Sequence, residues 1–382
     1  MEMEVEEEGI PSYKRLGIRN TIQTNFGDDY VFQIASCKEG SSMAVSLSTN
    51  MIKLYSPETG QYLGECTGHS GTISEISFSY PSSSHVLCSS SVDGTLRAWD
   101  TRTFNQVSLL RSGPSQELFA FSFGGSSGNL LAAGSNAQIL FWDWRIGKLV
   151  SCLEESHIDD VTQVLFAPNH QNKLISASVD GLLCTFDTDG QIDDDDNLES
   201  VMNLGTSIAK VGFFGETNQK LWCLTHIETL SIWDWELATQ EADFQDARSS
   251  VSACWNLDQV DYFVDCHYSQ ADERLWAIGA TNGGTLGYFP LNSNGTSRFF
   301  GTVDAVLEGG HSGVVRTIMP SSTGLGGSIG GRTIFGWTGG EDGRLCCWLS
   351  DEESTETNRS WVSGSLAIKS PKSYRKRRHH PY

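Results

Sequence analysis

One stretch of the sequence decides the fold: Leu87-Cys88-Ser89-Ser90-Ser91-Val92-Asp93-Gly94-Thr95-Leu96-Arg97-Ala98-Trp99-Asp100. It combines a strand of small residues, a turn at Asp-Gly, and a short apolar strand that ends in Trp-Asp. Asp-Gly between two strands predicts a tight hairpin turn, because glycine readily adopts the positive φ that such turns need. The pattern returns at 175–187 and again at 337–348. The chain therefore contains an internal repeat built on a β-hairpin.

An aromatic residue five positions beyond the turn marks each copy of the repeat. The markers are Tyr55, Trp99, Trp142, Phe186, Trp233, Phe289 and Trp348. Their successive separations are 44, 43, 44, 47, 56 and 59 residues. The first three match the length of a four-stranded propeller blade, and the longer ones indicate loop insertions. Seven markers predict an all-β, seven-bladed propeller, in which stacking buries both faces of every sheet.

The repeat resembles that of WD40-repeat proteins. In that family a loop His, a turn Asp, a strand Ser or Thr and the Trp form a hydrogen-bonded tetrad. The resemblance implies complete tetrads in blades two and seven and an incomplete one in blade four, where Phe186 has no N–H to donate. The candidate members are His69, Ser89, Asp93 and Trp99; His157, Ser176 and Asp180; and His311, Thr338, Asp342 and Trp348. Their equivalent places in the repeats favour a structural role over metal binding or acid–base catalysis.

Composition limits the functions that the chain can have. The net charge of −21 argues against binding of nucleic acid or an anionic membrane by the body of the protein. No apolar run is long enough to span a bilayer, and the acidic N-terminus is unlike a signal peptide, so we expect an intracellular protein. The ten cysteines include no C-x-x-C pair and are expected to be reduced and structural.

The two ends differ from the repeats in composition. Residues 1–11 are acidic and predict a disordered N-terminus, whereas 12–350 contain the propeller. The family closes its ring with an N-terminal strand, which the resemblance places near residues 12–24. Residues 351–382 predict a disordered tail that is first acidic and then basic.

No catalytic or cofactor-binding constellation stands out. The acidic run 193–196 lacks the alternation and the glycine of a calcium loop, so a solvated acidic loop is expected. The glycine-rich segment 324–331 lacks the Lys-Ser/Thr of a phosphate-binding loop and predicts a loop insertion. We therefore expect no enzyme activity, no cofactor and no metal, and a surface that binds proteins.

Two surface features suggest partners. The tail carries six basic residues from position 369 onward, which predict a nuclear-localisation or RNA-binding segment; the alternative is a solubilising tail. They are Lys369, Lys372, Arg375, Lys376, Arg377 and Arg378. Arg102 and Arg145 each follow Trp-Asp by two positions. This resembles the WD-x-Arg signature of receptors that dock onto the adaptor of cullin-four ubiquitin ligases; the alternative is a local salt bridge.

A longer stretch, 155–166 with Asp-Asp-Val-Thr-Gln at 159–163, resembles the WD-repeat eighty-nine-like family, which includes the plant GIGANTUS-type proteins. The likeness extends to Gly-Gly-Glu-Asp at 339–342, the acidic loop and the basic tail. It implies a nuclear or nucleolar scaffold, with a cytoplasmic pool, that binds assembly factors or ribosomal proteins during large-subunit assembly and affects growth. The cullin-four receptor is the alternative, and neither function involves a membrane.

Overall fold

The computed structural model describes residues 13–24, 29–37, 40–78, 83–113, 116–194, 196–255, 258–293, 297–320 and 333–350. The predicted acidic N-terminus 1–11, the glycine-rich segment 324–331 and the tail 351–382 lie outside the described residues.

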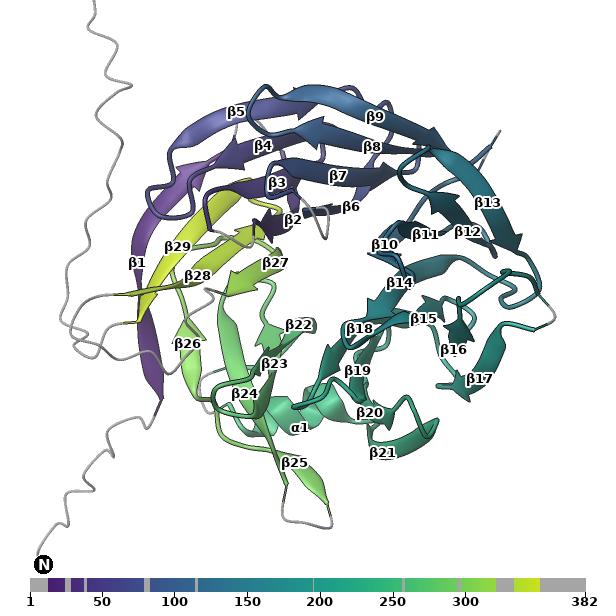
Figure 1. Cartoon of the computed structure of the whole chain (residues 1–382). Helices are drawn as coiled ribbons and strands as arrows, with labels where there is room; N and C mark the ends of the chain where they lie inside the picture. The colour runs from purple at the N-terminus through teal and green to yellow at the C-terminus, as the bar shows by residue number, and fades with distance from the viewer. Residues whose placement is uncertain are drawn as a thin grey trace, which may run out of the picture.

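Figure 1 shows short antiparallel sheets arranged in a ring around a central axis. Five of the sheets have four strands each, paired in the order of the sequence. Their strands are β2 (Val31–Ser36), β3 (Met43–Leu47), β4 (Met51–Tyr55) and β5 (Tyr62–Thr67); β6 (Ile73–Phe78), β7 (Val86–Ser91), β8 (Thr95–Asp100) and β9 (Asn105–Arg111); β10 (Ala120–Gly124), β11 (Leu130–Gly134), β12 (Ile139–Asp143) and β13 (Lys148–Leu153); β14 (Val161–Ala167), β15 (His170–Ser178), β16 (Leu182–Asp187) and β17 (Leu198–Asn203); and β18 (Ile208–Phe214), β19 (Lys220–Thr225), β20 (Leu230–Asp234) and β21 (Thr239–Phe244).

The remaining strands form one nine-stranded sheet. They are β22 (Tyr262–Ser269), β23 (Arg274–Ala280), β24 (Leu286–Ser293), β25 (Arg298–Phe300), β26 (Ala305–Leu307), β27 (Val315–Pro320), β28 (Thr333–Gly340), β29 (Arg344–Ser350) and β1 (Lys14–Gln23).

The N-terminal strand β1 joins two parts of this sheet. Its first residues pair in parallel with β26, and its remainder pairs antiparallel with β29, from Gly17 opposite Leu349 to Gln23 opposite Arg344. Figure 1 shows β1 along the outside of the ring beside both strands. The architecture is that of a WD40 propeller. Because β1 merges the last two groups of strands into one sheet, the count of seven blades stays a prediction.

The aromatic markers occupy equivalent positions in the third strand of each repeat. Trp99 in β8 pairs with Leu87 of β7, two residues before Ser89, and the other markers pair with β3, β11, β15, β19, β23 and β28 in the same way. At Trp99 the fourth strand contains a β-bulge, since Ala98 pairs with Ser108 and Trp99 with Gln106. The aromatic period in the sequence therefore reports the strand register.

The core lies between neighbouring sheets. One cluster joins Ala44 and Leu54 of the β2–β5 sheet to Ile76, Leu87 and Trp99 of the β6–β9 sheet. Middle strands such as β3 and β7 are buried almost throughout, whereas the outer strands β5, β9, β13 and β17 expose several apolar side chains. Each sheet is thus stabilised by burial against its neighbours.

Two elements were not predicted from the sequence. A short helix, α1 (Ala247–Ala253), lies in the connection between β21 and β22, so the fold is nearly, not entirely, all-β. The strand β25 pairs with the end of β24 and forms a projecting hairpin (Figure 1). Both contribute to the long marker separations on either side of Phe289.

Candidate functional site

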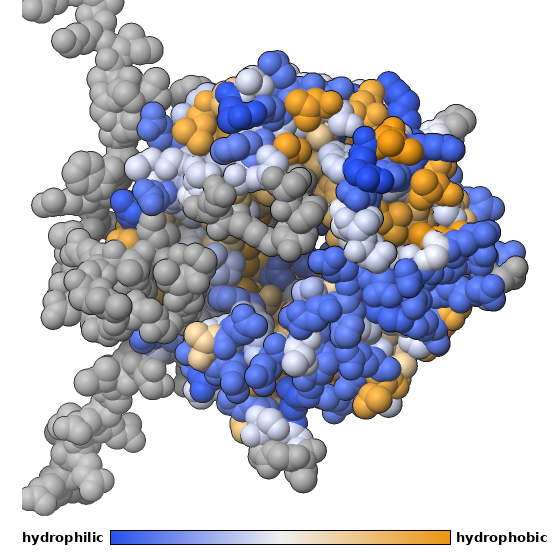
Figure 2. Space-filling model, viewed as in Figure 1, coloured by the Kyte–Doolittle hydropathy of each residue, from blue (hydrophilic) through white to orange (hydrophobic). Residues whose placement is uncertain are grey.

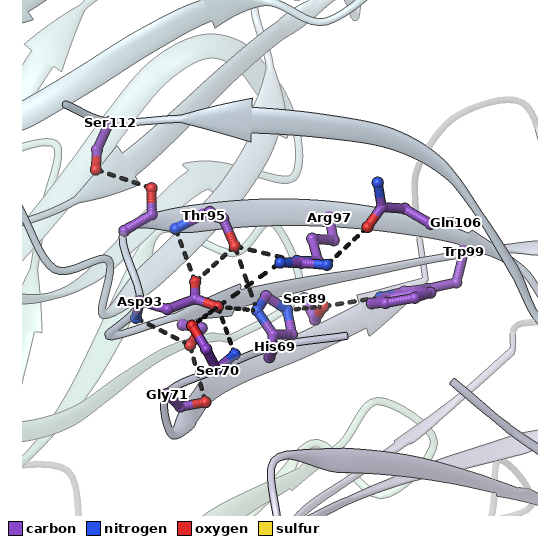
Figure 3. Close-up of polar contacts among 12 residues, drawn as sticks. His69, Ser70, Gly71, Ser89, Asp93, Thr95, Arg97, Trp99, Gln106 and Ser112 are labelled. Atoms are coloured by element: carbon purple, nitrogen blue, oxygen red, sulfur yellow. Dashed lines mark hydrogen bonds and ion pairs between the residues drawn. The ribbon is translucent and has the colours of Figure 1, made fainter. Parts of the chain in front are cut away.

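The polar network of the β6–β9 sheet contains the first predicted tetrad (Figure 3). His69 precedes the inner strand β6, Asp93 is in the β7–β8 turn, and Ser89 and Trp99 belong to β7 and β8. His69 Nδ1 lies 3.0 Å from Asp93 Oδ2, His69 Nε2 lies 2.7 Å from Ser89 Oγ, and Trp99 Nε1 donates to Ser89 Oγ at 2.9 Å. Asp93 also accepts hydrogen bonds from Ser70 and Thr95. The four predicted residues meet in one chain of contacts.

The chemistry of the donors fixes the direction of this chain. The ionised carboxylate of Asp93 can only accept, so His69 Nδ1–H donates to it. In the neutral ring Nε2 then accepts from Ser89 Oγ, which itself accepts from the indole of Trp99. This requires a neutral His69, and burial lowers the pKa of His69 although Asp93 opposes the shift. His69 is fully engaged in structure and is not available as a base or metal ligand.

The carboxylate of Asp93 is stabilised in its charged form. Burial would raise its pKa, but hydrogen bonds from Thr95, Ser70 and His69 outweigh burial and hold the pKa at about 2. Because the folded-state pKa lies below the usual value of 3.8, the stabilisation is present above that value and is lost as pH falls through about 2. The tetrad is therefore fully formed at neutral pH.

The β-turn beside Asp93 requires glycine. Gly94 has φ of +74°, and a Cβ built on it would lie 2.6 Å from the carbonyl oxygen of Gln116. The Asp-Gly signal in the sequence therefore has a steric cause at this position.

The structure also brings together the other predicted tetrad residues. In the last repeat His311 contacts Asp342 and Thr338, and Trp348 Nε1 donates to Thr338 Oγ1 at 2.8 Å. In the β14–β17 sheet His157 lies 3.0 Å from Asp180 and 2.7 Å from Ser176. Phe186 fills the place of the Trp there, so the chain of contacts ends at the serine.

Side chains on the inner strands form a second network, which the sequence analysis missed. Each bonds to the backbone of the next inner strand around the ring. Four of them accept from equivalent N–H groups: Gln33 from Ile76 (2.7 Å), Glu75 from Phe121 (2.7 Å), Gln163 from Val211 (2.6 Å) and Thr317 from Ile34 (3.2 Å). The other junctions use Ser122 Oγ with the Phe166 N–H, Lys210 Nζ with the Val264 carbonyl, and Tyr262 Oη with the Val315 N–H.

This inner network links β2, β6, β10, β14, β18, β22 and β27 into a continuous circle. It satisfies backbone groups on strand edges that would otherwise face the channel unpaired. The signal in the sequence is a glutamine at the third position of an inner strand, two residues after a buried valine. Examples are Val31-Phe32-Gln33 and Val161-Thr162-Gln163. One member, Glu75, is a carboxyl group, and burial raises its pKa to about 7 although the Phe121 N–H opposes the shift.

The two candidate adaptor-binding arginines occupy matching places on neighbouring sheets. Arg102 follows β8 and bonds to both carboxylate oxygens of Asp100, at 3.0 and 2.7 Å. Arg145 follows β12 and lies 3.4 Å from Asp143. Their side chains are 66% and 65% exposed. Each guanidinium thus makes the local salt bridge that was the alternative interpretation, and each remains accessible.

The acidic run is more ordered than we expected from its sequence. Asp194 accepts hydrogen bonds from the backbone N–H groups of Glu154 and Glu155, and the Ile192 carbonyl accepts from Ser151 Oγ at 2.6 Å. Ile192 also packs against the cluster between the β10–β13 and β14–β17 sheets. The described part of this loop therefore also forms a strap between two sheets, which the sequence did not predict.

Apolar side chains collect on the outer strands of two neighbouring sheets. Val107 of β9, Ile146 beside β13, and Leu149 and Val150 of β13 are 58%, 68%, 41% and 50% exposed. Figure 2 shows hydrophobic residues at the upper right, where Figure 1 places β9, β12 and β13. Exposed apolar groups of this kind suit protein partners.

The described residues include no group of three or more His, Cys, Asp or Glu side chains that could hold a metal ion. No described helix has the length and apolar character to cross a membrane. Burial raises the pKa of Cys66, Cys184 and Cys346 to about 12, so these thiols are poor nucleophiles. The basic residues Lys369 to Arg378 lie outside the described residues.

Comparison with known proteins identifies the family. A model of the WD domain, G-beta repeat, matches residues 60–100, which contain the complete tetrad of Figure 3. The WD repeat-containing protein GTS1 of Arabidopsis thaliana is 58% identical over 371 residues, or 97% of this chain and 93% of that protein. The chain belongs to this family of WD-repeat proteins. The WD repeat-containing protein 89 homolog of Dictyostelium discoideum is 30% identical over 77% of this chain and 78% of its own length.

These relatives confirm both resemblances drawn from the sequence, to WD40 repeats and to the WD-repeat eighty-nine-like, GIGANTUS-type proteins. An uncharacterised WD repeat-containing protein of Saccharomyces cerevisiae is also similar, at 27% identity over 57% of each chain. WD-repeat proteins are generally scaffolds, and none of these three names states an enzymatic activity.

Proposed function

We propose that this WD-repeat protein is a non-enzymatic scaffold that holds proteins together during assembly of the large ribosomal subunit, in the nucleus and nucleolus. The observation that carries the proposal is the similarity to the WD-repeat eighty-nine-like family along almost the whole chain. This process is what the resemblance described in the sequence analysis implies. The histidines that could have served catalysis are engaged in tetrads, as described above, which supports a binding role.

The distribution of charge supports different roles for the propeller and for the C-terminal tail. The whole chain has a net charge of −21, which disfavours contact between the propeller and RNA phosphates. The tail from Lys369 to Arg378 carries six basic residues and no acidic one. We propose that the tail directs nuclear import or contacts RNA, while the propeller binds assembly factors or ribosomal proteins.

Co-sedimentation tests this function. Tagged full-length protein is expressed in cells of a plant related to the Arabidopsis relative, and extracts are fractionated on sucrose gradients with and without a brief depletion of ribosomal RNA synthesis. We expect the protein to sediment with pre-60S particles and to leave those fractions after depletion. Sedimentation only as free protein under both conditions would refute the assembly role.

A second function is favoured by one observation: the equivalent, exposed placement of Arg102 and Arg145 on neighbouring sheets. A cullin-four adaptor would have to compete with Asp100 and Asp143 for these guanidinium groups. Affinity purification of wild type and of the Arg102→Ala/Arg145→Ala variant decides between the functions. Adaptor recovered with wild type and lost with the variant supports the receptor; adaptor absent from both leaves the scaffold alone.

A further inference from the structure

A cavity of about 280 Å³ lies where the inner strands β18, β22 and β27 converge. Its lining includes Trp222 and Tyr268, which belong to one hydrophobic cluster, together with Asp265 and His267 from β22 and Pro320 at the end of β27. These residues are near the ends of the inner strands, on the side opposite to the tetrad histidines, which precede the inner strands. Figure 1 shows the three strands facing the centre of the ring.

Polar groups in this cavity are not all used by the fold. His267 Nδ1 is buried and has no hydrogen-bond partner among the described residues. Burial lowers the pKa of His267, so the ring is neutral at physiological pH. A neutral imidazole with a free nitrogen offers either an acceptor or a donor to a guest. A buried polar atom without a partner is costly, and a ligand that satisfies it removes that cost.

The electrostatic environment of the cavity is mainly acidic. The charges of Asp265 and Asp272 favour the protonated form of His267, against the effect of burial. Burial raises the pKa of Tyr268, and the charges of Glu273 and Glu216 raise it further. Glu216 is exposed in the β18–β19 turn, and Asp272 and Glu273 are exposed in the β22–β23 turn. A cation, Lys210, lies beside the cavity, and its Nζ lies 3.4 Å from Asp265 and donates to the Val264 carbonyl.

We propose that this cavity binds a basic side chain of an arginine- or lysine-rich segment of a partner protein. Aromatic rings attract cations over their faces, and Asp265 supplies a negative charge in the lining of the cavity. The carboxylates of the neighbouring turns (Glu216, Asp272 and Glu273) would bind the flanking basic residues of the same segment. A guanidinium fits best, because it can stack on an aromatic ring such as Trp222 and donate to the carboxylate of Asp265 at the same time.

The inference deepens the proposed function, because it rests on the chain being a binding scaffold and names the chemistry of one partner. The following measurement concerns the cavity alone, whereas the gradient experiment concerns the assembly. Loss of peptide binding with intact co-sedimentation would refute only the cavity, and the reverse result would refute only the ribosomal role.

The probe is a short fluorescein-labelled Gly/Ser peptide with spaced arginines, and its comparator has citrulline, the neutral isostere, in place of arginine. Binding to the full-length protein is measured by anisotropy at physiological salt. We expect the arginine peptide to bind at least about tenfold more tightly than the citrulline peptide, which corresponds to one good charge-assisted contact. Equal binding of the two peptides would overturn the proposal.

Two variants locate the site. Asp265→Asn removes a cavity charge with little change of shape and is expected to weaken binding about tenfold. The Glu216→Gln/Glu273→Gln variant changes only side chains in exposed turns, so it is expected to fold as wild type does. Its affinity for the arginine peptide is expected to fall about threefold. The matched control is Glu155→Gln/Asp159→Asn, which removes two exposed charges from the β13–β14 connection at the other end of the inner strands.

The control separates a site from general attraction. A control that weakens binding as much as the Glu216→Gln/Glu273→Gln variant would overturn the proposal, because the acidic body alone would then explain affinity. The same titration on protein lacking residues 369–382 examines this chain's own basic tail. If only the truncated protein binds the peptide, the tail is the occupant and the partner segment is refuted; unchanged affinity supports the partner.

Discussion

Replacing Glu75 by Gln should make the protein more stable at alkaline pH and leave it nearly unchanged at acidic pH. Glu75 Oε2 accepts the Phe121 N–H at 2.7 Å, and the amide oxygen of Gln can accept the same bond. Gln33 and Gln163 already do so at equivalent junctions of the inner network. The substitution therefore keeps the hydrogen bond between β6 and β10 and removes only the ionisable carboxyl group.

The magnitude follows from the pKa of Glu75, which burial raises from its usual value of 4.5 to about 7. Between these values the unfolded chain ionises while the folded protein stays protonated, so the stability of wild type falls as pH rises. Above pH 7 the whole loss is present. The full shift would be worth about 3 kcal/mol, and about 1–2 kcal/mol after allowing for the partial exposure of the side chain.

The assay is urea unfolding of wild type and Glu75→Gln at pH 5 and pH 8, followed by tryptophan fluorescence. The variant should exceed wild type only slightly at pH 5, where about a quarter of the loss is present, and by about 1–2 kcal/mol at pH 8. Gln163→Glu is the converse variant and should acquire the same loss of stability with rising pH. Identical differences between Glu75→Gln and wild type at both pH values would refute the reasoning.

The remaining predictions concern the tetrads and the tail. Asp93→Ala should lower the free energy of unfolding by about 3 kcal/mol, because it leaves His69 and nearby donors without their buried acceptor. Asp187→Ala, in the sheet whose tetrad lacks Trp, should cost less than about 1 kcal/mol, and equal unfolding midpoints would contradict the tetrad interpretation. Deletion of residues 372–382 should leave the melting temperature unchanged and move a fluorescent fusion out of the nucleus, so continued nuclear accumulation would disprove the localisation.

Sequence patterns predicted the features that repeat. Asp-Gly at 93–94 and the aromatic period were sufficient for the hairpins and their register, because these positions face the same steric and packing demands in every copy. The tetrads were predictable because four residue types recur at fixed separations. The structure places Trp99, Ser89, His69 and Asp93 within hydrogen-bond distance, as described above.

Features made by contacts between different repeats were not predictable in this way. Gln33, Glu75 and Thr317 differ in chemistry, and their shared role depends on which backbone N–H lies beside them in the closed ring. The strap formed by Ile192 and Asp194 depends on a neighbouring sheet that no local pattern specifies. The cavity near His267 depends on three inner strands that are far apart in the sequence.

The pairing of β1 with β29 has a consequence for synthesis on the ribosome. The strand β1 leaves the exit tunnel before the other strands of the ring and pairs with β29, the last of the described strands, so the ring cannot close until β29 has been translated. At 5–20 residues per second, β1 waits on the order of half a minute for its partner. During that interval β1 is a free edge for mispairing, and a nascent-chain chaperone that shields residues 14–23 would raise the yield of native protein.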